Sequence, residues 1–163
     1  MKKFLFARFT ALVLAAASTA FAADMPEWLW FEKTDGTDIR FFRKVFSVQG
    51  RVSKAELVAT ADDKLEVFLN GERVLQNNSW QNPVKVDLTG KFVSGQNVLA
   101  IRAENRGSSP AGAFAKLEIT SNKGKTFIVT DASWKASAKE EPNWNRSSFD
   151  DSAWAAPESL GKL

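Results

Sequence analysis

Residues 64–76 read KLEVFLNGERVLQ, and this stretch decides the class of fold. Apolar side chains stand at every second position from Leu65 to Leu69. A period of two predicts a β-strand with one buried face. The Asn70-Gly71 pair that follows predicts a two-residue type I′ turn, because both central residues of that turn need positive φ. Residues 72–76 are therefore expected to run back antiparallel to 64–69.

The same alternation recurs along most of the chain. Further strands are expected at residues 40–48, 55–61, 84–88, 97–104, 113–120 and 125–130, and a single helical turn at 88–93. Strands of five to nine residues, separated by polar turns and with almost no helical periodicity, are typical of two packed antiparallel sheets. The sequence predicts an all-β fold, an antiparallel β-sandwich of the jelly-roll type.

The composition excludes several classes of chemistry. The 163 residues contain no histidine and no cysteine. The protein therefore cannot build a Ser-His-Asp triad, a cysteine nucleophile, a disulfide, or a metal site with imidazole or thiolate ligands. Carboxylate chemistry, cations held by oxygen ligands, and binding without chemistry remain.

Residues 1–22, MKKFLFARFTALVLAAASTAFA, have the layout of a secretory signal peptide: a basic start, an apolar stretch and a small-x-small end. Cleavage is predicted after Ala22, which leaves residues 23–163 as a single domain. A membrane span is the less favoured alternative, because the apolar run is short. The sequence thus predicts a secreted or periplasmic protein with no stable membrane insertion after cleavage.

Charge gives no reason to expect a nucleic-acid partner. The whole chain has 22 basic and 19 acidic residues, and three of the basic ones lie within 1–22. Once that segment is removed the charges balance. Nucleic-acid binding usually needs a basic surface, so none is expected.

The six tryptophans are the main candidates for a binding site, because an indole face can stack on the apolar face of a pyranose ring. Trp28, Trp30, Trp134 and Trp154 are expected to cover the ends of the core. Polar neighbours flank Trp80 and Trp144, which are expected to be exposed. The candidate carbohydrate-binding residues are Trp80, Trp144, Arg102 and Asn105. For Asn105 the alternative is a structural role, capping backbone groups at the bend.

Acidic residues give weaker signals. The pairs at 62–63, 140–141 and 150–151 are expected to stabilise turns through bonds to backbone amides. The protein is expected to need no cofactor, with a structural calcium ion as the alternative; its candidate ligands are Asp35, Asp38, Asp150 and Asp151. A glycosidase would need two distant acids, such as Asp87 and Glu104, to face each other in a cleft.

Several phrases, taken in order, resemble a known domain family. They are residues 61–63 (ADD) leading into 67–71 (VFLNG), then 95–100 (GQNVLA), 130–135 (TDASWK) and 149–154 (FDDSAW). This order resembles the galactose-binding-like jelly roll, particularly the N-terminal accessory domain of bacterial alpha-L-rhamnosidases and the sugar-binding-type domain of beta-galactosidases. The resemblance runs from about Trp28 to Trp154.

The resemblance implies a non-catalytic carbohydrate-binding module that accompanies a glycoside-processing protein. In such proteins catalysis belongs to a separate barrel domain, for which this chain has no room. The expected partners are a polysaccharide or glycan and an adjoining catalytic domain. The alternative is a purely structural spacer that packs against a neighbouring catalytic or haem-binding domain. The irregular stretch 138–163 favours a fragment of a longer protein or a very short module that stands alone.

Overall fold

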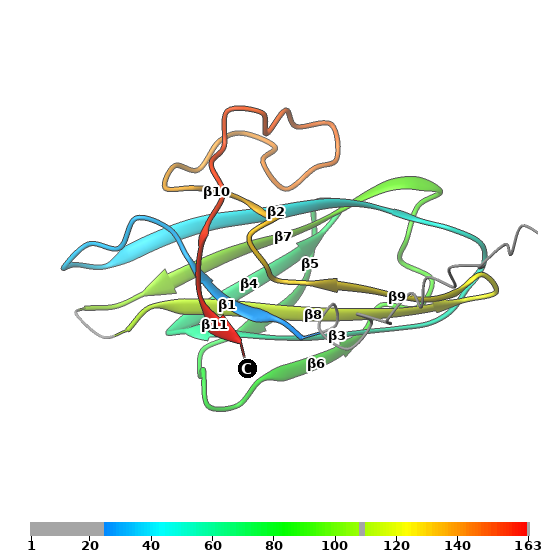
Figure 1. Cartoon of the computed structure of the whole chain (residues 1–163), viewed down its shortest axis with the longest axis horizontal. Coiled ribbons are helices and arrows are strands. Elements are labelled where there is room, and N and C mark those ends of the chain that lie inside the picture. The colour runs from blue at the N-terminus through cyan, green and yellow to red at the C-terminus, as the bar shows by residue number, and fades with distance from the viewer. Residues whose placement is uncertain (1–24, 108–109, 163) are drawn as a thin grey trace, which may run out of the picture.

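The computed structural model describes residues 25–107 and 110–162, which form two antiparallel sheets packed face to face (Figure 1). The predicted all-β sandwich is confirmed. The strands are β1 (Glu27–Trp30), β2 (Asp38–Val48), β3 (Val52–Asp62), β4 (Lys64–Leu69), β5 (Glu72–Asn77), β6 (Val84–Asp87), β7 (Gly95–Asn105), β8 (Gly112–Ser121), β9 (Gly124–Val129), β10 (Lys135–Ser137) and β11 (Glu158–Lys162).

The two sheets have different strand orders. The first sheet runs β11-β1-β8-β3-β6, with β9 also paired to β8. The second runs β10-β2-β7-β4-β5. The longest pairings, β2 with β7 and β3 with β8, lie at the centres of the two sheets. Consecutive strands therefore alternate between sheets at several points, as in a jelly roll.

The hairpin expected at residues 64–76 is present as β4 and β5. Leu69 pairs with Glu72, so the loop holds the two residues Asn70 and Gly71. Their φ values are 53° and 90°, the positive pair that a type I′ turn requires. Local sequence chemistry therefore sets the register of this edge of the second sheet.

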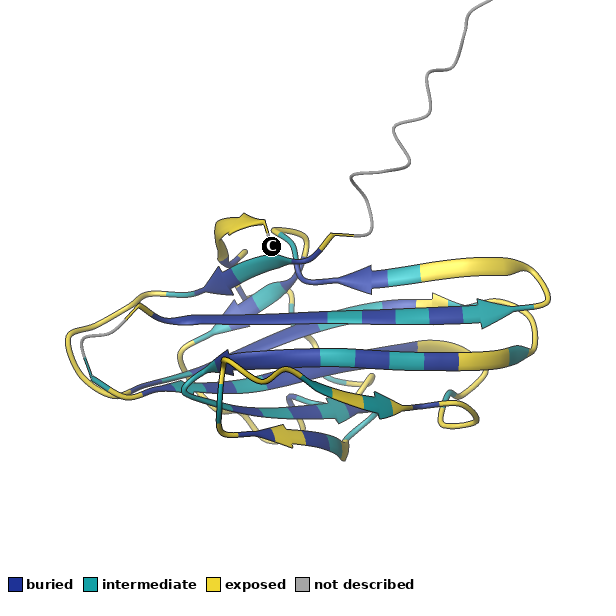
Figure 2. Ribbon diagram, turned by 90° about the horizontal axis from the view of Figure 1, so that it is seen from below, coloured by how far each residue is buried: buried dark blue, intermediate teal, exposed yellow. Residues whose placement is uncertain are grey.

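The main core fills the space between the sheets. Alternate residues of each long strand point inward, which gives the banded burial seen along the strands in Figure 2. The inward-facing set includes Ala55, Leu57, Ala59 and Ala61 of β3, Leu65, Val67 and Leu69 of β4, Leu99, Ile101 and Ala103 of β7, and Leu117 and Ile119 of β8. Trp30 and Trp134 are buried in the same core, as expected from the sequence.

A second apolar cluster covers the outer face of the second sheet. Residues 138–157, between β10 and β11, fold over β2 (Figure 1) and place Trp144 and Trp154 against Phe41. The ring centroids of Phe41 and Trp144 lie 5.0 Å apart, and Trp144 stacks on Trp154 at 6.3 Å. Trp144 is only 4% exposed. The prediction that it is exposed is wrong, because its polar neighbours in sequence turn outward while its ring closes this face.

Other differences concern short elements. The helical turn expected at 88–93 is wrong: Lys91 donates from its backbone N to Leu88 O in a tight turn, and the described residues contain no helix. Accordingly, none of the described segments is a helix able to span a membrane. Strands β1, β10 and β11 were not predicted; they are three to five residues long. The predicted signal peptide, residues 1–22, lies outside the described residues.

Candidate functional site

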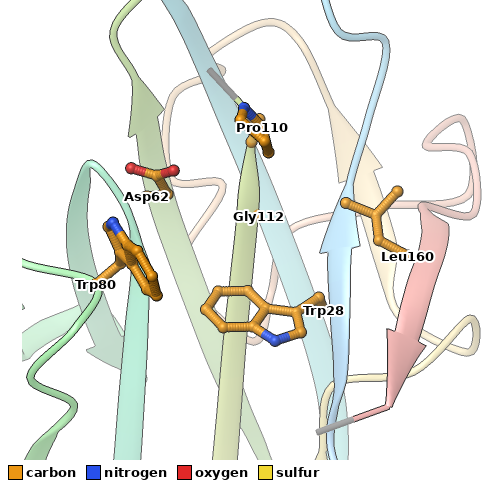
Figure 3. A pocket seen from close by; sticks show the side chains of 7 residues that line it. Trp28, Asp62, Trp80, Pro110, Gly112 and Leu160 are labelled. Carbon is orange, nitrogen blue, oxygen red and sulfur yellow. The ribbon is translucent and has the colours of Figure 1, made fainter.

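An open groove of about 330 Å³ lies on the outer face of the first sheet, where β3 ends (Figure 3). Ala59 and Ala61 of β3 point into the core, so Thr60 and Asp62 point outward to this face. We call it the tryptophan groove. Its lining residues are Trp28, Asp62, Trp80, Pro110, Ala111, Gly112 and Leu160.

Trp28 forms the floor of the groove. Its ring packs edge-on against Phe114 of β8, with the centroids 4.9 Å apart. It also lies over the backbone of Gly112, where a Cβ atom would come within 2.8 Å of Trp28 Cε3 (Figure 3). Glycine at 112 therefore lets the indole lie flat on the sheet. The sequence predicted that Trp28 covers an end of the core, but the structure leaves it half-buried on the outer face of the first sheet.

Trp80 approaches from the loop between β5 and β6. It is 46% exposed, so the expected exposure of this residue is confirmed. Thr60 Oγ1 lies 3.2 Å from Ser79 O and 3.3 Å from Trp80 O, which ties the loop to β3. Trp28 and Trp80 thus present two indole rings on the same concave face (Figure 3).

Asp62 is the ionisable side chain among the lining residues. Partial burial, a hydrogen bond with Asp63 and the negative charge of Asp63 raise its pKa from 3.8 to about 6. Asp63 in turn accepts a hydrogen bond from Arg106 N at 2.7 Å, and its own N donates to Glu104 O at 2.6 Å. These two bonds attach the end of β7 to the end of β3. The chain continues from there to Pro110, which lines the groove.

The raised pKa of Asp62 predicts a specific pH dependence of stability. An acid with a higher pKa in the folded state holds more protons when folded, so stability falls as pH rises through that window. The free energy of unfolding of the natural chain, measured against Asp62→Asn, should therefore increase as pH is lowered from about 7 to about 4. Urea titrations at four or five pH values would measure this difference. A difference that stays constant with pH would contradict it.

The four residues proposed from sequence as sugar contacts do not come together. Trp80 lines the groove, whereas Trp144 is buried under the other sheet. Arg102, on the second sheet, forms ion pairs with Glu66 and Glu104 at 3.4 and 3.5 Å. Asn105 is fully buried and donates to Gly107 O, which matches the capping alternative.

Sequence reasoning missed Trp28 and Asp62 as groove residues. Trp28 precedes the buried Leu29, but Trp30, which follows Leu29, is buried in the main core as well, so alternation does not identify Trp28 as outward-facing. Asp62 follows the inward-facing Ala61, and the alternation of β3 does point its side chain outward. Neither pattern reveals that the two residues share one face with Trp80, because that depends on the pairing of β1, β8 and β3.

The candidate calcium ligands have other partners. Burial works to raise the pKa of Asp38, but hydrogen bonds from Thr34 and the charge of Arg40 bring it below its ordinary value. Asp151 pairs with Arg43 at 2.5 Å. Asp150 accepts from Ser152 N, and Asp35 is exposed. In the described part of the chain, no three acidic side chains gather as a metal site would require.

The acids that a glycosidase would need do not face each other. Asp87 lies on β6, in the first sheet, and accepts a hydrogen bond from Thr89 N at 2.8 Å. Glu104 lies on β7, in the second sheet, where Arg106 donates to it at 2.7 Å. Each carboxylate thus has a local partner on a different layer of the sandwich.

Two alpha-L-rhamnosidases are similar to this chain in sequence, although no protein-family model matches it. An alpha-L-rhamnosidase of Streptomyces avermitilis is 31% identical over 141 residues, which cover 79% of this chain and 14% of the relative. An alpha-L-rhamnosidase of Formosa agariphila is 26% identical over 159 residues, covering 72% and 17%. The chain therefore spans about one sixth or less of the length of these relatives.

Solved structures agree. The Streptomyces avermitilis alpha-L-rhamnosidase, complexed with L-rhamnose, superposes with a TM-score of 0.77 and 29% identity, over 83% of this chain and 14% of that one. A lectin from Pleurotus ostreatus in complex with GalNAc superposes with a TM-score of 0.71 and 25% identity, over 86% and 44%. The resemblance read from the sequence is confirmed: the chain is similar to a short β-sandwich part of alpha-L-rhamnosidases and to a lectin.

Proposed function

We propose that this chain is a secreted, non-catalytic carbohydrate-binding module, an accessory domain of a glycoside-processing protein. The observation that carries the proposal is the tryptophan groove, where two indoles and one carboxylate share a concave face. The similarity to parts of alpha-L-rhamnosidases and to a lectin supports it. Export rests on the signal-peptide pattern of residues 1–22.

The chemistry of the groove suits a sugar. Trp28 and Trp80 offer flat apolar surfaces on which the C–H face of a pyranose can stack, a contact of the order of 1 kcal/mol per ring. Asp62 offers oxygens that accept hydrogen bonds from hydroxyl groups. The groove is open, so the expected affinity is modest. Its volume, about 330 Å³, is at the small end for ligand sites.

A glycan array followed by isothermal titration of the strongest ligands tests the proposal. Trp80→Ala should weaken the best ligand about tenfold, since one stacking contact is lost. Val93→Ala is the control, because Val93 is also an exposed apolar residue but lies outside the groove. No binding to any plant, algal or microbial glycan would overturn the proposal. So would equal affinities of the Trp80→Ala and natural chains.

The calcium alternative can be settled in the same titrations. The candidate ligands remain Asp35, Asp38, Asp150 and Asp151, of which Asp35 and Asp150 have no ion pair with Arg40 or Arg43. Carboxylate oxygens are the ligands that calcium prefers. Affinity is measured with excess calcium and with a chelator, for the natural chain and for the double variant Asp35→Asn, Asp150→Asn. A chelator effect on the natural chain alone supports a calcium site, whereas equal affinities in all four measurements argue against one.

The alternative function is structural. Leu160, at the groove, is 49% exposed and belongs to β11, an edge strand whose residues are all exposed. An apolar surface of this kind can also receive a neighbouring domain. The same glycan array separates the two functions, because a spacer binds no sugar. Hydrolysis of aryl glycosides by the isolated chain would contradict both.

A further inference from the structure

Trp80 is held in place by a network that lies beneath the groove. Its loop, residues 78–82, has no regular secondary structure, and a free loop would present the indole in many orientations. The loop instead wraps around the side chain of Asn77, the last residue of β5. Asn77 is only 7% exposed.

Each polar atom of the Asn77 side chain has a partner in the loop or on β3. Its Nδ2, whose two hydrogens are shared among three acceptors, lies 2.9 Å from Thr60 Oγ1, Ser79 O and Asn82 O. Its Oδ1 accepts from Ser79 N at 3.1 Å. The bonds to residues 79 and 82 close the loop on both sides of Trp80, and the bond to Thr60 joins it to the first sheet.

Thr60 completes the connection. It is fully buried, lies next to Asp62 on the outer face of β3, and its hydroxyl approaches the carbonyl groups of Ser79 and Trp80. The network therefore links the second sheet, through β5, to the sheet that carries Trp28. Trp80 is fixed relative to Trp28 by buried polar groups, although its ring is exposed.

We propose that Asn77 is a positioning residue of the tryptophan groove, which holds the 78–82 loop so that Trp80 faces the same ligand as Trp28. The effect on affinity rests on the proposed function, whereas the effect on the loop does not. Loss of the network turns one loop conformation into several, and apparent affinity falls with the fraction of molecules that present Trp80 correctly. If that fraction is about one tenth, affinity falls about tenfold.

Fluorine NMR of the chain labelled with 5-fluorotryptophan tests the loop without any ligand. The natural chain has six tryptophans, and the Trp80→Phe variant assigns the Trp80 signal. In Asn77→Ala and in Asn77→Asp, which loses the amide donor, the Trp80 signal should move toward the position of an unfolded indole. Thr60→Val removes one partner with little change in shape and should give a smaller shift in the same direction. The Trp30 and Trp134 signals should remain.

Asn97, near the start of β7, provides a matched control because it does not line the tryptophan groove. It is fully buried and also makes four side-chain bonds, to Asn70, Gly95 and both backbone groups of Val93. Asn97→Ala should lower stability comparably but leave the Trp80 signal and the ligand affinity unchanged. A shifted Trp80 signal in this control would assign the effect to general destabilisation and overturn the proposal.

The outcomes separate this inference from the proposed function. A natural Trp80 signal in Asn77→Asp and Thr60→Val would overturn the positioning role, even if Asn77→Ala fails to fold. A displaced Trp80 signal, together with unchanged affinity in both Asn77→Asp and Trp80→Ala, would overturn the proposed site but leave the loop network standing. A displaced signal with about tenfold weaker binding supports both.

Discussion

Replacing Arg43 with alanine is expected to lower the free energy of unfolding by about 3 kcal/mol, the lower end of the cost of breaking a buried ion pair, because its partner Asp151 is 25% exposed. The Arg43 side chain is fully buried between the second sheet and the segment 138–157. Its Nη1 lies 2.5 Å from Asp151 Oδ2 and 3.1 Å from Phe149 O, and its Nη2 donates to Arg146 O at 2.9 Å.

The cost arises because the half-buried Asp151 carboxylate and the carbonyl groups of Phe149 and Arg146 would lose their donor, and because the space filled by the fully buried side chain would be left empty. Burial lowers the pKa of the Arg43 guanidinium, and the charge of Asp151 partly offsets this. The guanidinium also lies 5.1 Å from the Phe149 ring centroid, so its removal loosens the aromatic cluster of Trp144 and Trp154. Urea denaturation followed by tryptophan fluorescence would measure the loss.

Two further variants make this prediction specific. Asp151→Asn, which leaves the charge of Arg43 uncompensated, should also destabilise the chain. Arg73→Met is the control, because Arg73 pairs with Glu66 at an exposed site, where an ion pair contributes about 1 kcal/mol or less. If Arg43→Ala cost no more than Arg73→Met, segment 138–157 would not depend on the buried guanidinium.

Removing both groove tryptophans is expected to abolish detectable glycan binding. Each single change, Trp28→Ala or Trp80→Ala, should cost about 1–2 kcal/mol of binding free energy through lost stacking and apolar burial. Together they should weaken the best ligand about a hundredfold or more, beyond the range of a modest-affinity titration.

A double-mutant cycle with the milder changes Trp28→Phe and Trp80→Phe, which keep an aromatic ring and a measurable affinity, shows whether the two rings act on one ligand. Rings that hold the same sugar from two sides should give a total loss that differs from the sum of the single losses, because each ring orients the sugar for the other. A coupling free energy of about 0.5 kcal/mol or more would show that both rings contact the same ligand. Single variants that each leave affinity unchanged would show that the ligand binds elsewhere on the chain.

Much of the fold could be predicted from the sequence because its determinants are local. The alternation in β3, β4 and β8 marks which residues face the core, and those residues are buried. Short strands such as β1 and β10 escape such prediction, because three or four residues are too few to show a period. They are held by pairing with β8 and β2, partners that are distant in sequence.

The contrast between Trp80 and Trp144 shows where local reasoning about the site ends. Both have polar neighbours in sequence, so the two residues look alike. Trp80 stays exposed because its loop is fastened at the rim of the first sheet, where no further segment covers it among the described residues. Trp144 is buried because segment 138–157 crosses Phe41 and Phe68.

The amino-acid sequence by itself determined the two-layer antiparallel architecture and the Asn70-Gly71 turn, since periodicity and backbone preference act between close neighbours in the chain. Only the tertiary structure decided which aromatic side chains remain available to a ligand. Trp28, Asp62, Trp80 and Leu160 come from four separate elements and meet because strand pairing brings β11, β1, β8 and β3 side by side. Whether an outward-facing ring is exposed depends on what crosses over it, and distant parts of the chain settle that.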